Sequence, residues 1–318
     1  MPRPVNVFAG PYVDRVAHLR KDVAWIAASL ADPGTLLVPV WQSRSLLRHG
    51  PAGCEAAFLA AGAVDRSAFG DPVLLGQFGS HACFAVEFER PEAVIERFGR
   101  DEVRFEDLRV AAAQLEARQA GVLAYARAML HWRARHRHCG VCGAPTASTS
   151  GGHVMTCTRE SCRTEHFPRL DPAIIVLVSD GERALLGRQA GWPEGRYSTI
   201  AGFVEPGESL EDAVAREVLE ETGIVVEDAD YHSSQPWPFP SSLMIGFTAT
   251  ARPGQTPAAR DELEDARWFT REEVASGAVG LPPPQSVSYA LVEHWFDAGA
   301  PQRLRETTGV RLWTAPRR

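Results

Sequence analysis

One segment limits the possible folds more than any other: residues 202–224, GFVEPGESLEDAVAREVLEETGI. It predicts a glycine-containing loop and then a helix at about 209–222, with Glu217, Glu220 and Glu221 at positions i, i+3 and i+4 on one helix face. Each like-charged pair costs about 0.2–0.5 kcal/mol, and anions are also unfavourable at the C-terminal end of a helix dipole. A solvated acidic face is the plain alternative, but Mg²⁺ or Mn²⁺ would offset the repulsion by taking these carboxylates as ligands.

The segment matches the pattern G-x5-E-x7-R-E-U-x-E-E-x-G-U, in which U is a bulky aliphatic residue, at every specified position. On this motif the chain resembles the Nudix hydrolases, which cleave nucleoside diphosphates linked to another group. The resemblance implies an α/β/α sandwich, Mg²⁺ or Mn²⁺ held by Glu217, Glu220 and Glu221, and Arg216 orienting the glutamates through charge-assisted hydrogen bonds. Metal ions would stabilise charge on the phosphates and activate a water. Glu220 and a loop glutamate, Glu262, are both candidates for the general base.

A second motif, SQPWPFPSS at residues 234–242, predicts a rigid loop in which three prolines hold Trp237 and Phe239. On physical grounds the two rings serve equally well as a hydrophobic plug or as a platform that stacks on a base, worth about 1–3 kcal/mol. At this distance after the first motif, the loop resembles the signature of the NADH pyrophosphatase branch of the family. That resemblance implies a dinucleotide pocket lined by Gln235, Pro236, Trp237, Pro238, Phe239, Pro240, Ser241 and Ser242.

The same resemblance implies further site residues. The backbone carbonyl of Ala201 and the carboxylate of Glu262 would complete the metal shell, and Phe167 and Ser288 would contact the substrate. Relatives often have tyrosine where this chain has Phe167, so stacking persists there while the hydrogen bond of a hydroxyl is lost.

Four of the six cysteines form two pairs, Cys139-Gly-Val-Cys142 and Cys157-Thr-Arg-Glu-Ser-Cys162, separated by residues 143–156. No secretion signal is predicted, so the clustering indicates a metal site rather than disulfides. Four thiolates would enclose a structural Zn²⁺, on two knuckles joined by a β-hairpin. The resemblance agrees, because the NADH pyrophosphatase branch carries a zinc ribbon before its catalytic domain. A Cys/His site is the alternative, and the nearby histidines are His131, His136, His138 and His153.

We predict three domains: an N-terminal α/β domain at 1–136, a zinc ribbon at 137–168 and a Nudix hydrolase domain at 169–318, with no internal repeat. Hydrophobic periodicity and turn signals give the expected elements. Before the ribbon these are helices at 14–30 and, as one long helix, 108–137, and strands at 35–41, 73–77 and 81–88. After the ribbon they are strands at 173–179, 184–188, 197–201, 231–234, 243–251 and 266–269, and helices at 209–222, 271–275 and 286–297.

The bulk properties limit the partners. A net charge of -7 gives no global attraction to nucleic acid or to anionic membranes, and no long apolar run predicts a membrane span, so we expect a soluble, cytoplasmic protein. The resemblance implies a homodimer that hydrolyses NADH to reduced nicotinamide mononucleotide and AMP, with NAD⁺ and NAD-capped RNA 5′ ends as further substrates. Two alternatives are a nucleic-acid-binding protein that uses the ribbon and its neighbouring arginines, and a Nudix enzyme that acts on ADP-ribose.

Overall fold

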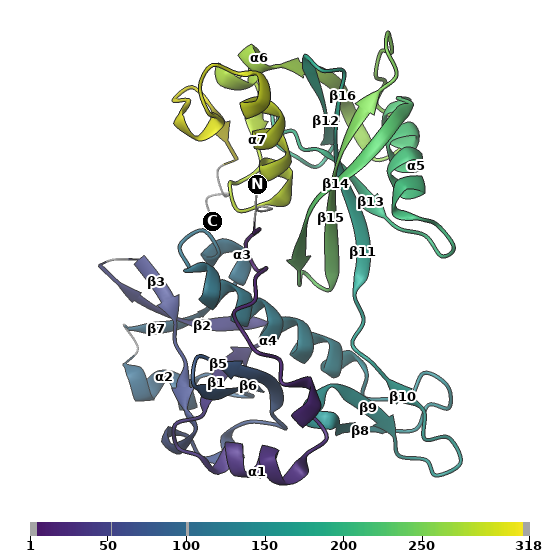
Figure 1. The fold of residues 1–318 in the computed structure, drawn as a ribbon. Coiled ribbons are helices and arrows are strands. Elements are labelled where there is room, and N and C mark those ends of the chain that lie inside the picture. Colours follow the sequence, from purple (N-terminus) through teal and green to yellow (C-terminus); the bar gives the residue numbers. More distant parts are fainter. Residues whose placement is uncertain (1–4, 52, 100–101, 314–318) are drawn as a thin grey trace. The chain divides into compact units, whose positions relative to one another are not determined.

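The computed structural model describes residues 5–51, 53–99 and 102–313, and its contacts divide the chain into two compact units. The N-terminal unit comprises Val7–Leu170 and takes in Trp237–Ser241 from far along the chain. The C-terminal unit comprises the rest of the described chain from Asp171 onward, together with Val5 and Asn6. Figure 1 shows the elements of both units. No helix within the described ranges is long and apolar enough to cross a membrane.

The N-terminal unit is built on a seven-stranded sheet. Its strands are β1 (Leu36–Trp41), β2 (Arg44–Gly50), β3 (Gly53–Ala56), β4 (Leu59–Ala60), β5 (Val73–Phe78), β6 (His81–Glu87) and β7 (Val103–Glu106). Its helices are α1 (Val23–Ala31), α2 (Glu92–Phe98), α3 (Leu108–Ala111) and α4 (Ala117–Arg135), with the 3-10 turns η1 (Ala17–Leu19), η2 (Ala61–Ala63) and η3 (Arg66–Ala68). The buried side chains of α4 share one hydrophobic core with alternate residues of β1 and β6, so α4 covers one face of this sheet.

A separate three-stranded sheet follows in the same unit. It consists of β8 (Thr146–Thr149), β9 (Val154–Cys157) and β10 (Glu165–His166), with the turn η4 (Ser150–Gly152) between the first two strands. The hairpin β8–β9 is the one that the cysteine spacing predicts.

The C-terminal unit is an α/β/α sandwich, as the sequence predicts. Its six-stranded sheet contains β11 (Asp171–Ser179), β12 (Arg183–Gln189), β13 (Ile200–Phe203), β14 (Val226–Trp237), β15 (Ser242–Ala251) and β16 (Leu263–Thr270). Helix α5 (Leu210–Thr222) shares a core with Ile174 and Val176 of β11. Helix α7 (Val287–Gly299) shares a core with Ile175 and Leu177, whose side chains point to the opposite face. The remaining elements are α6 (Arg271–Ala275), β17 (Gly280–Leu281), η5 (Leu304–Glu306) and β18 (Arg311–Leu312).

The two large sheets share one topology. In each, a central strand (β1 or β11) pairs antiparallel with the next strand (β2 or β12) and parallel with a later one (β6 or β15). A short strand, β4 or β13, also pairs with the central strand, and β7 or β16 pairs with β2 or β12. They differ where α5 lies, because the corresponding segment between β4 and β5 holds only η2 and η3. The prediction of no internal repeat is therefore wrong at the level of topology.

Two predicted helices have different limits in the structure. The helix expected from residue 14 begins at Val23, where the Asp22 carboxylate caps it by accepting from the Trp25 N–H, while Asp14 pairs with Gln77 of β5 instead. The long helix expected at 108–137 is two helices. Glu116, with an extended backbone (φ −60°, ψ 140°), is the N-cap residue of α4 and breaks the run.

Several strands also differ from the predicted ones. The strand expected at 197–201 begins only at Ile200, because the Tyr197 N–H donates to the Gly280 carbonyl and Ser198 pairs with Gly187. The short strands β2, β3 and β7 had no prediction, since their sequences mix charged residues and glycine with few apolar residues.

The loop Trp237–Ser241 packs as a plug within the N-terminal unit. The rings of Trp237 and Phe239 lie 6.2 and 5.8 Å from that of Phe8, measured between centroids. The guanidinium of Arg127 lies 5.0 Å from the Phe239 centroid and donates hydrogen bonds to the carbonyls of Pro238, at 2.7 Å, and Ser43. Burial lowers the pKa of Arg127. A half-buried cation therefore ties this loop to the unit through carbonyl groups and a ring face.

We expect Arg127→Met to lower the free energy of unfolding by about 2 kcal/mol, because a buried carbonyl left without its donor costs roughly 1–3 kcal/mol. Urea denaturation measures the loss. Arg118→Met is the matched control, since Arg118 is an exposed residue of the same helix that stacks on Phe78 at 5.2 Å; it should cost less than about 0.5 kcal/mol. Equal losses for the two variants would show that Arg127 does not hold the loop.

Candidate active site

Helix α5 has strong signals at both ends. At its start Ser209 and Asp212 form a reciprocal capping box, and at its end Gly223 adopts a left-handed conformation (φ 71°) with its N–H bonded to the Leu219 carbonyl. Ala213, Val214 and Val218 are buried against the sheet. The opposite, polar face presents the predicted acidic residues of this helix.

One guanidinium organises this end of the site. Arg216 donates to Glu208 at 2.7 and 3.0 Å, to Glu217 at 2.9 Å and to Glu220 at 3.1 Å, and a further bond of 2.9 Å reaches the Phe203 carbonyl. These bonds, the one to Glu208 foremost, raise the pKa of Arg216. Our sequence analysis did not single out Glu208 as a site residue, although it is the first glutamate of the motif pattern and receives two of these bonds.

The position of Gly202 shows why the motif begins with glycine. It lies on β13, where it pairs with Ile174 of β11, and a Cβ there would lie only 1.8 Å from the carboxyl carbon of Glu217. Glycine thus lets β13 approach the helix so closely that the Glu217 carboxylate packs against backbone. The next residue back, Ala201, pairs with Ile175 on the same strand.

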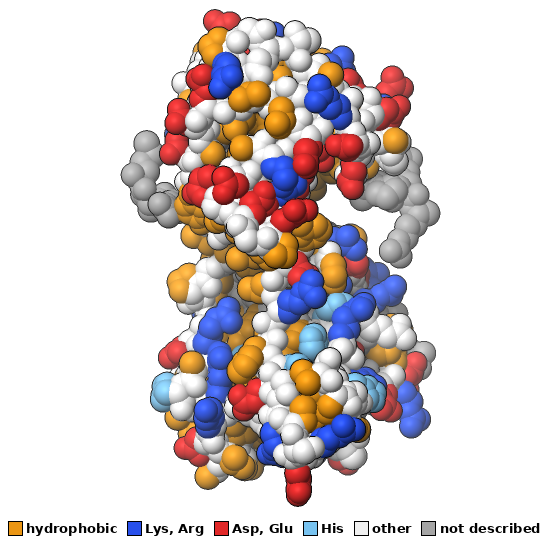
Figure 2. Space-filling view, turned by 90° about the vertical axis from the view of Figure 1, so that its right-hand side faces the viewer, with side chains coloured by type: hydrophobic (Ala, Val, Ile, Leu, Met, Phe, Trp, Pro, Cys, Tyr) orange, Lys and Arg blue, Asp and Glu red, His pale blue; other side chains and the backbone are white. Residues whose placement is uncertain are grey.

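Glu221 is the buried acid of the cluster, with 8% of its surface exposed. Burial, and then the charges of Glu217, Glu262, Asp261 and Glu220, raise its pKa to about 7. Burial also raises the pKa of Glu217. The space-filling view shows acidic side chains crowding this side of the C-terminal unit (Figure 2). Buried carboxylates beside like charges are costly, and oxygen-preferring divalent cations fit this donor set.

The four clustered cysteines form a second metal-binding group. Their sulfur atoms all lie within 4.8 Å of one another, with Cys139 and Cys162 at 3.8 Å and Cys142 and Cys157 at 3.5 Å. A tetrahedral Zn²⁺ with bonds of about 2.3 Å requires sulfur atoms about 3.8 Å apart. The group therefore fits structural zinc. The predicted Cys/His alternative is not needed: His153, for example, is buried and bonded to the Leu74 carbonyl at 2.7 Å.

The residues predicted to contact substrate lie in three surroundings. Phe167 is 61% exposed in the N-terminal unit. Gln235 is buried, and its amide bonds to the Gln285 carbonyl and the Val287 N–H at the start of α7. Ser288 is also buried, with its hydroxyl 2.9 Å from those of Ser198 and Thr199. Gln235 thus joins β14 to α7, and Ser288 joins the residues just before β13 to α7.

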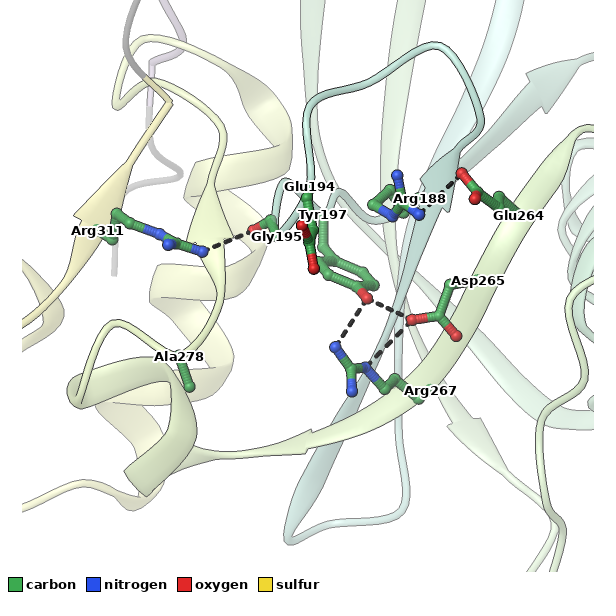
Figure 3. A pocket seen from close by; sticks show the side chains of 9 residues that line it. All are labelled: Arg188, Glu194, Gly195, Tyr197, Glu264, Asp265, Arg267, Ala278 and Arg311. Carbon is green, nitrogen blue, oxygen red and sulfur yellow. Dashed lines mark hydrogen bonds and ion pairs between the residues drawn. The ribbon is translucent and has the colours of Figure 1, made fainter.

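A different hollow, of about 600 Å³, lies elsewhere on the C-terminal unit, and none of the α5 glutamates lines it. Figure 3 shows that two of its arginines are already paired with acids: Arg188 with Glu264 at 2.8 Å, and Arg267 with Asp265 at 3.3 Å and with the Tyr197 hydroxyl at 2.8 Å. Nearby, the Arg311 guanidinium donates to the Gly195 carbonyl at 3.1 Å.

This contact gives the C-terminal segment a structural role that the sequence did not reveal. Besides Arg311, the Trp313 indole N–H donates to the Gly280 carbonyl, and its ring packs edge-on against Trp192. The segment thereby fastens the loop that precedes β13.

Comparisons with known proteins match three parts of the chain. A NUDIX domain model matches residues 169–293, an NADH pyrophosphatase zinc ribbon domain matches 134–167, and an NADH pyrophosphatase-like rudimentary NUDIX domain matches 34–132. The NAD-capped RNA hydrolase NudC of Mycobacterium bovis is 37% identical over 92% of this chain and 95% of its own length. The chain belongs to the NADH pyrophosphatase branch of the Nudix hydrolases. The rudimentary domain accounts for the repeated topology of the two Nudix-like sheets.

Two other relatives are longer than their match to this chain. The NAD-capped RNA hydrolase NUDT12 of Macaca fascicularis is 44% identical over 58% of this chain, which spans only 44% of that protein. Human NAD(P)H pyrophosphatase NUDT13, a mitochondrial protein, is 41% identical over 61% of this chain and 59% of its own length.

We expect Gly202→Ala to weaken Mn²⁺ binding by roughly 10- to 100-fold, the usual effect of disturbing the support of a metal ligand, because the added methyl group displaces the Glu217 carboxylate. Electron paramagnetic resonance of Mn²⁺ measures the affinity. Gly191→Ala serves as the control, since a Cβ at Gly191 meets nothing within 4 Å. Unchanged Mn²⁺ affinity in the Gly202 variant would exclude Glu217 from the metal site.

We expect Glu221→Gln to stabilise the protein in EDTA by roughly 2 kcal/mol more at pH 8 than at pH 5. The folded-state pKa of Glu221 is raised to about 7, so its stability contribution is full below the unfolded value of about 4.3 and is lost as the pH rises through 7. Urea denaturation at the two pH values measures this. Glu220→Gln is the control, because the Glu220 side chain is 51% exposed. The same pH dependence in both variants would contradict the burial of the Glu221 charge.

Proposed function

We propose that the chain hydrolyses the pyrophosphate of NADH to give reduced nicotinamide mononucleotide and AMP, with Mg²⁺ or Mn²⁺ at the α5 glutamates. The observation that carries the proposal is the clamp of Arg216 on Glu208, Glu217 and Glu220 beside the buried Glu221. Membership of the NADH pyrophosphatase branch and the activity for which the NUDT13 relative is named support the choice of substrate.

The residues of the cluster have separate tasks in this proposal. Glu217, Glu220, Glu221 and Glu262, with the carbonyl of Ala201, hold the divalent ions, while Arg216 keeps the first two glutamates oriented. Divalent ions bound there supply positive charge to the phosphate oxygens and make water a better nucleophile. The oxygen of one water bonds to a phosphorus, the bridging P–O bond breaks, and the proton of the water passes to a carboxylate. Glu220 and Glu262, both exposed, are the two candidates for that carboxylate.

We propose two kinds of task for the predicted substrate residues. Phe167 presents an open ring that can stack on a base. Gln235 and Ser288 shape the pocket by fixing the start of α7. The segment Pro236–Ser242 would form a stiff wall, since its rings at Trp237 and Phe239 already pack against Phe8.

The proposal extends to NAD⁺ and to RNA capped with NAD, because both contain the same pyrophosphate and two of the relatives are named for the latter activity. We also propose three domains, at 1–136, 137–168 and 169–318. The proposed assembly is a homodimer, and the proposed location is the cytoplasm. The family matches at 34–132, 134–167 and 169–293 support the domain limits.

Purified protein with Mg²⁺ or Mn²⁺ should convert NADH to AMP and reduced nicotinamide mononucleotide, as resolved by product chromatography. Glu221→Gln should lower kcat at least 100-fold because a buried metal ligand is lost, while Glu211→Gln, an exposed residue in the first turn of the same helix, should leave kcat unchanged. No turnover of NADH, NAD⁺ or ADP-ribose by the metal-loaded wild type would refute the enzyme proposal. Turnover of ADP-ribose alone would change the substrate and keep the chemistry.

A further inference from the structure

A hydrogen bond within the C-terminal unit joins two segments that lead to proposed metal ligands. The hydroxyl of Tyr197, in the loop before β13, donates to the carboxylate of Asp265 on β16, and Figure 3 shows the two side chains meeting in the hollow of about 600 Å³. The loop continues into Ala201 of β13, and β16 begins directly after Glu262. These are the two proposed metal ligands that do not lie on α5.

The bond is buried and has further support. Tyr197 is 3% exposed, and its ring packs edge-on against Phe269 with 4.8 Å between centroids. Its hydroxyl also accepts from the Arg267 guanidinium at 2.8 Å, and Arg267 in turn pairs with Asp265 at 3.3 Å. Burial, and then the bond to Asp265, raise the pKa of Tyr197, so the hydroxyl keeps its proton and remains a donor. A buried network with its partners in place is costly to shift.

A second contact between the same two segments lies over Gly187 of β12. Gly187 pairs with Ser198 and, within the sheet, with Ala266 of β16. A Cβ on Gly187 would lie only 2.7 Å from the Cδ1 of Leu263 and 3.1 Å from the Cδ1 of Ile200. The missing side chain is therefore what allows these two apolar side chains to approach each other over β12.

The two contacts lie on opposite faces of the sheet. Ile200 and Leu263 belong to the core shared with α5, whereas Tyr197 belongs to the core shared with α7. Ile200 is the direct neighbour of Ala201, and Leu263 is the direct neighbour of Glu262. The segments that carry these ligands are thus joined from both sides, and neither can shift against the other without breaking a contact.

We propose that Tyr197, Asp265 and Gly187 are positioning residues for the metal site. They set the spacing between the Ala201 carbonyl and the Glu262 carboxylate, and so the affinity of the site for its divalent ion. Mg²⁺ demands near-octahedral geometry with oxygen ligands at about 2.0–2.1 Å, so a small shift of one segment weakens binding. The three residues act through these ligands and not by contact with the ion. The inference rests on the proposed function, which supplies both ligands.

The first test is Mn²⁺ affinity, measured by electron paramagnetic resonance on the full-length, zinc-loaded protein without substrate. Tyr197→Phe removes only the hydroxyl and should weaken Mn²⁺ binding about tenfold, as loss of a residue that orients a metal ligand does. Tyr289→Phe is the matched control, because Tyr289 belongs to the same core and is also 3% exposed. It should bind Mn²⁺ as the wild type does. Equal weakening by the two variants would overturn the positioning role.

Conservative variants test the two contacts separately. Asp265→Ala should weaken Mn²⁺ binding about tenfold, while Asp265→Asn, whose amide oxygen still accepts from the hydroxyl, should stay close to wild type. Gly187→Ala should also weaken binding about tenfold, whereas Gly191→Ala, with nothing within 4 Å of its Cβ, should not. Loss of affinity in Asp265→Asn as large as in Asp265→Ala would count against the hydrogen bond.

A double-mutant cycle distinguishes positioning from general damage to the fold. In a Glu262→Gln background Tyr197→Phe should change Mn²⁺ affinity less than about twofold, because one of the two ligands whose spacing it sets is already lost. Gly202→Ala, which acts through Glu217, should keep its full effect in that background. Equal losses from Tyr197→Phe in both backgrounds would overturn the inference.

Catalysis separates this inference from the proposed function. Tyr197→Phe should raise the Mn²⁺ concentration needed for half-maximal NADH hydrolysis about tenfold and leave kcat at saturating Mn²⁺ unchanged. If the wild type hydrolyses no dinucleotide while the cycle with Glu262→Gln gives the expected result, the proposed function fails and the positioning role stands. If the wild type hydrolyses NADH and Tyr197→Phe binds Mn²⁺ normally, the positioning role fails and the enzyme proposal stands.

Discussion

The gathering of carboxylates around Arg216 is the interaction on which the catalytic unit depends. Four acids carry like charges here, Glu208 in the loop before α5 and Glu217, Glu220 and Glu221 on the helix, and the guanidinium offsets their repulsion by bonding to three of them. Arg216 bonds also to the Phe203 carbonyl of β13, so it joins helix to strand as well as acid to acid. The position of β13 is in turn set by its pairing with β11, where only a glycine fits opposite the Glu217 carboxylate.

A comparison of the two large sheets, which share one topology, shows which part of the C-terminal unit carries the acidic cluster around Arg216. Both units place a central strand between an antiparallel and a parallel neighbour, and a helix, α4 or α7, covers one face. Only the C-terminal sheet carries α5 after its short strand; the other has η2 and η3 there. The strand pairing of this topology therefore does not depend on the acidic helix, which in the proposed function supplies three of the metal ligands. The rudimentary unit instead uses its core and Arg127 to hold the loop that begins at Trp237.

The sequence could predict those parts whose signals are local. The capping box at Ser209, the periodicity of α5 and the two cysteine pairs each lie within a few turns of chain, and each corresponds to an observed element. Long-range contacts were beyond reach. Nothing local indicates that Arg127 would bond to Pro238, or that Arg311 would bond to Gly195, because more than a hundred residues separate each pair. The topological repeat could not be predicted for the same reason. The same strand pairing occurs in both sheets, but it joins segments that are far apart in the sequence and share no residue pattern.

Net charge was the least informative of the sequence properties, and the structure explains why. The excess of acids is concentrated in the residues of the C-terminal unit, where like charges surround the buried Glu221. The N-terminal unit is nearly balanced, so exposed cations such as Lys21 act on their surroundings without a strong opposing field. Screening limits such fields to about 10 Å at moderate salt. A charged ligand at the surface therefore responds to the side chains that it contacts, and the total charge of the protein neither attracts nor excludes it.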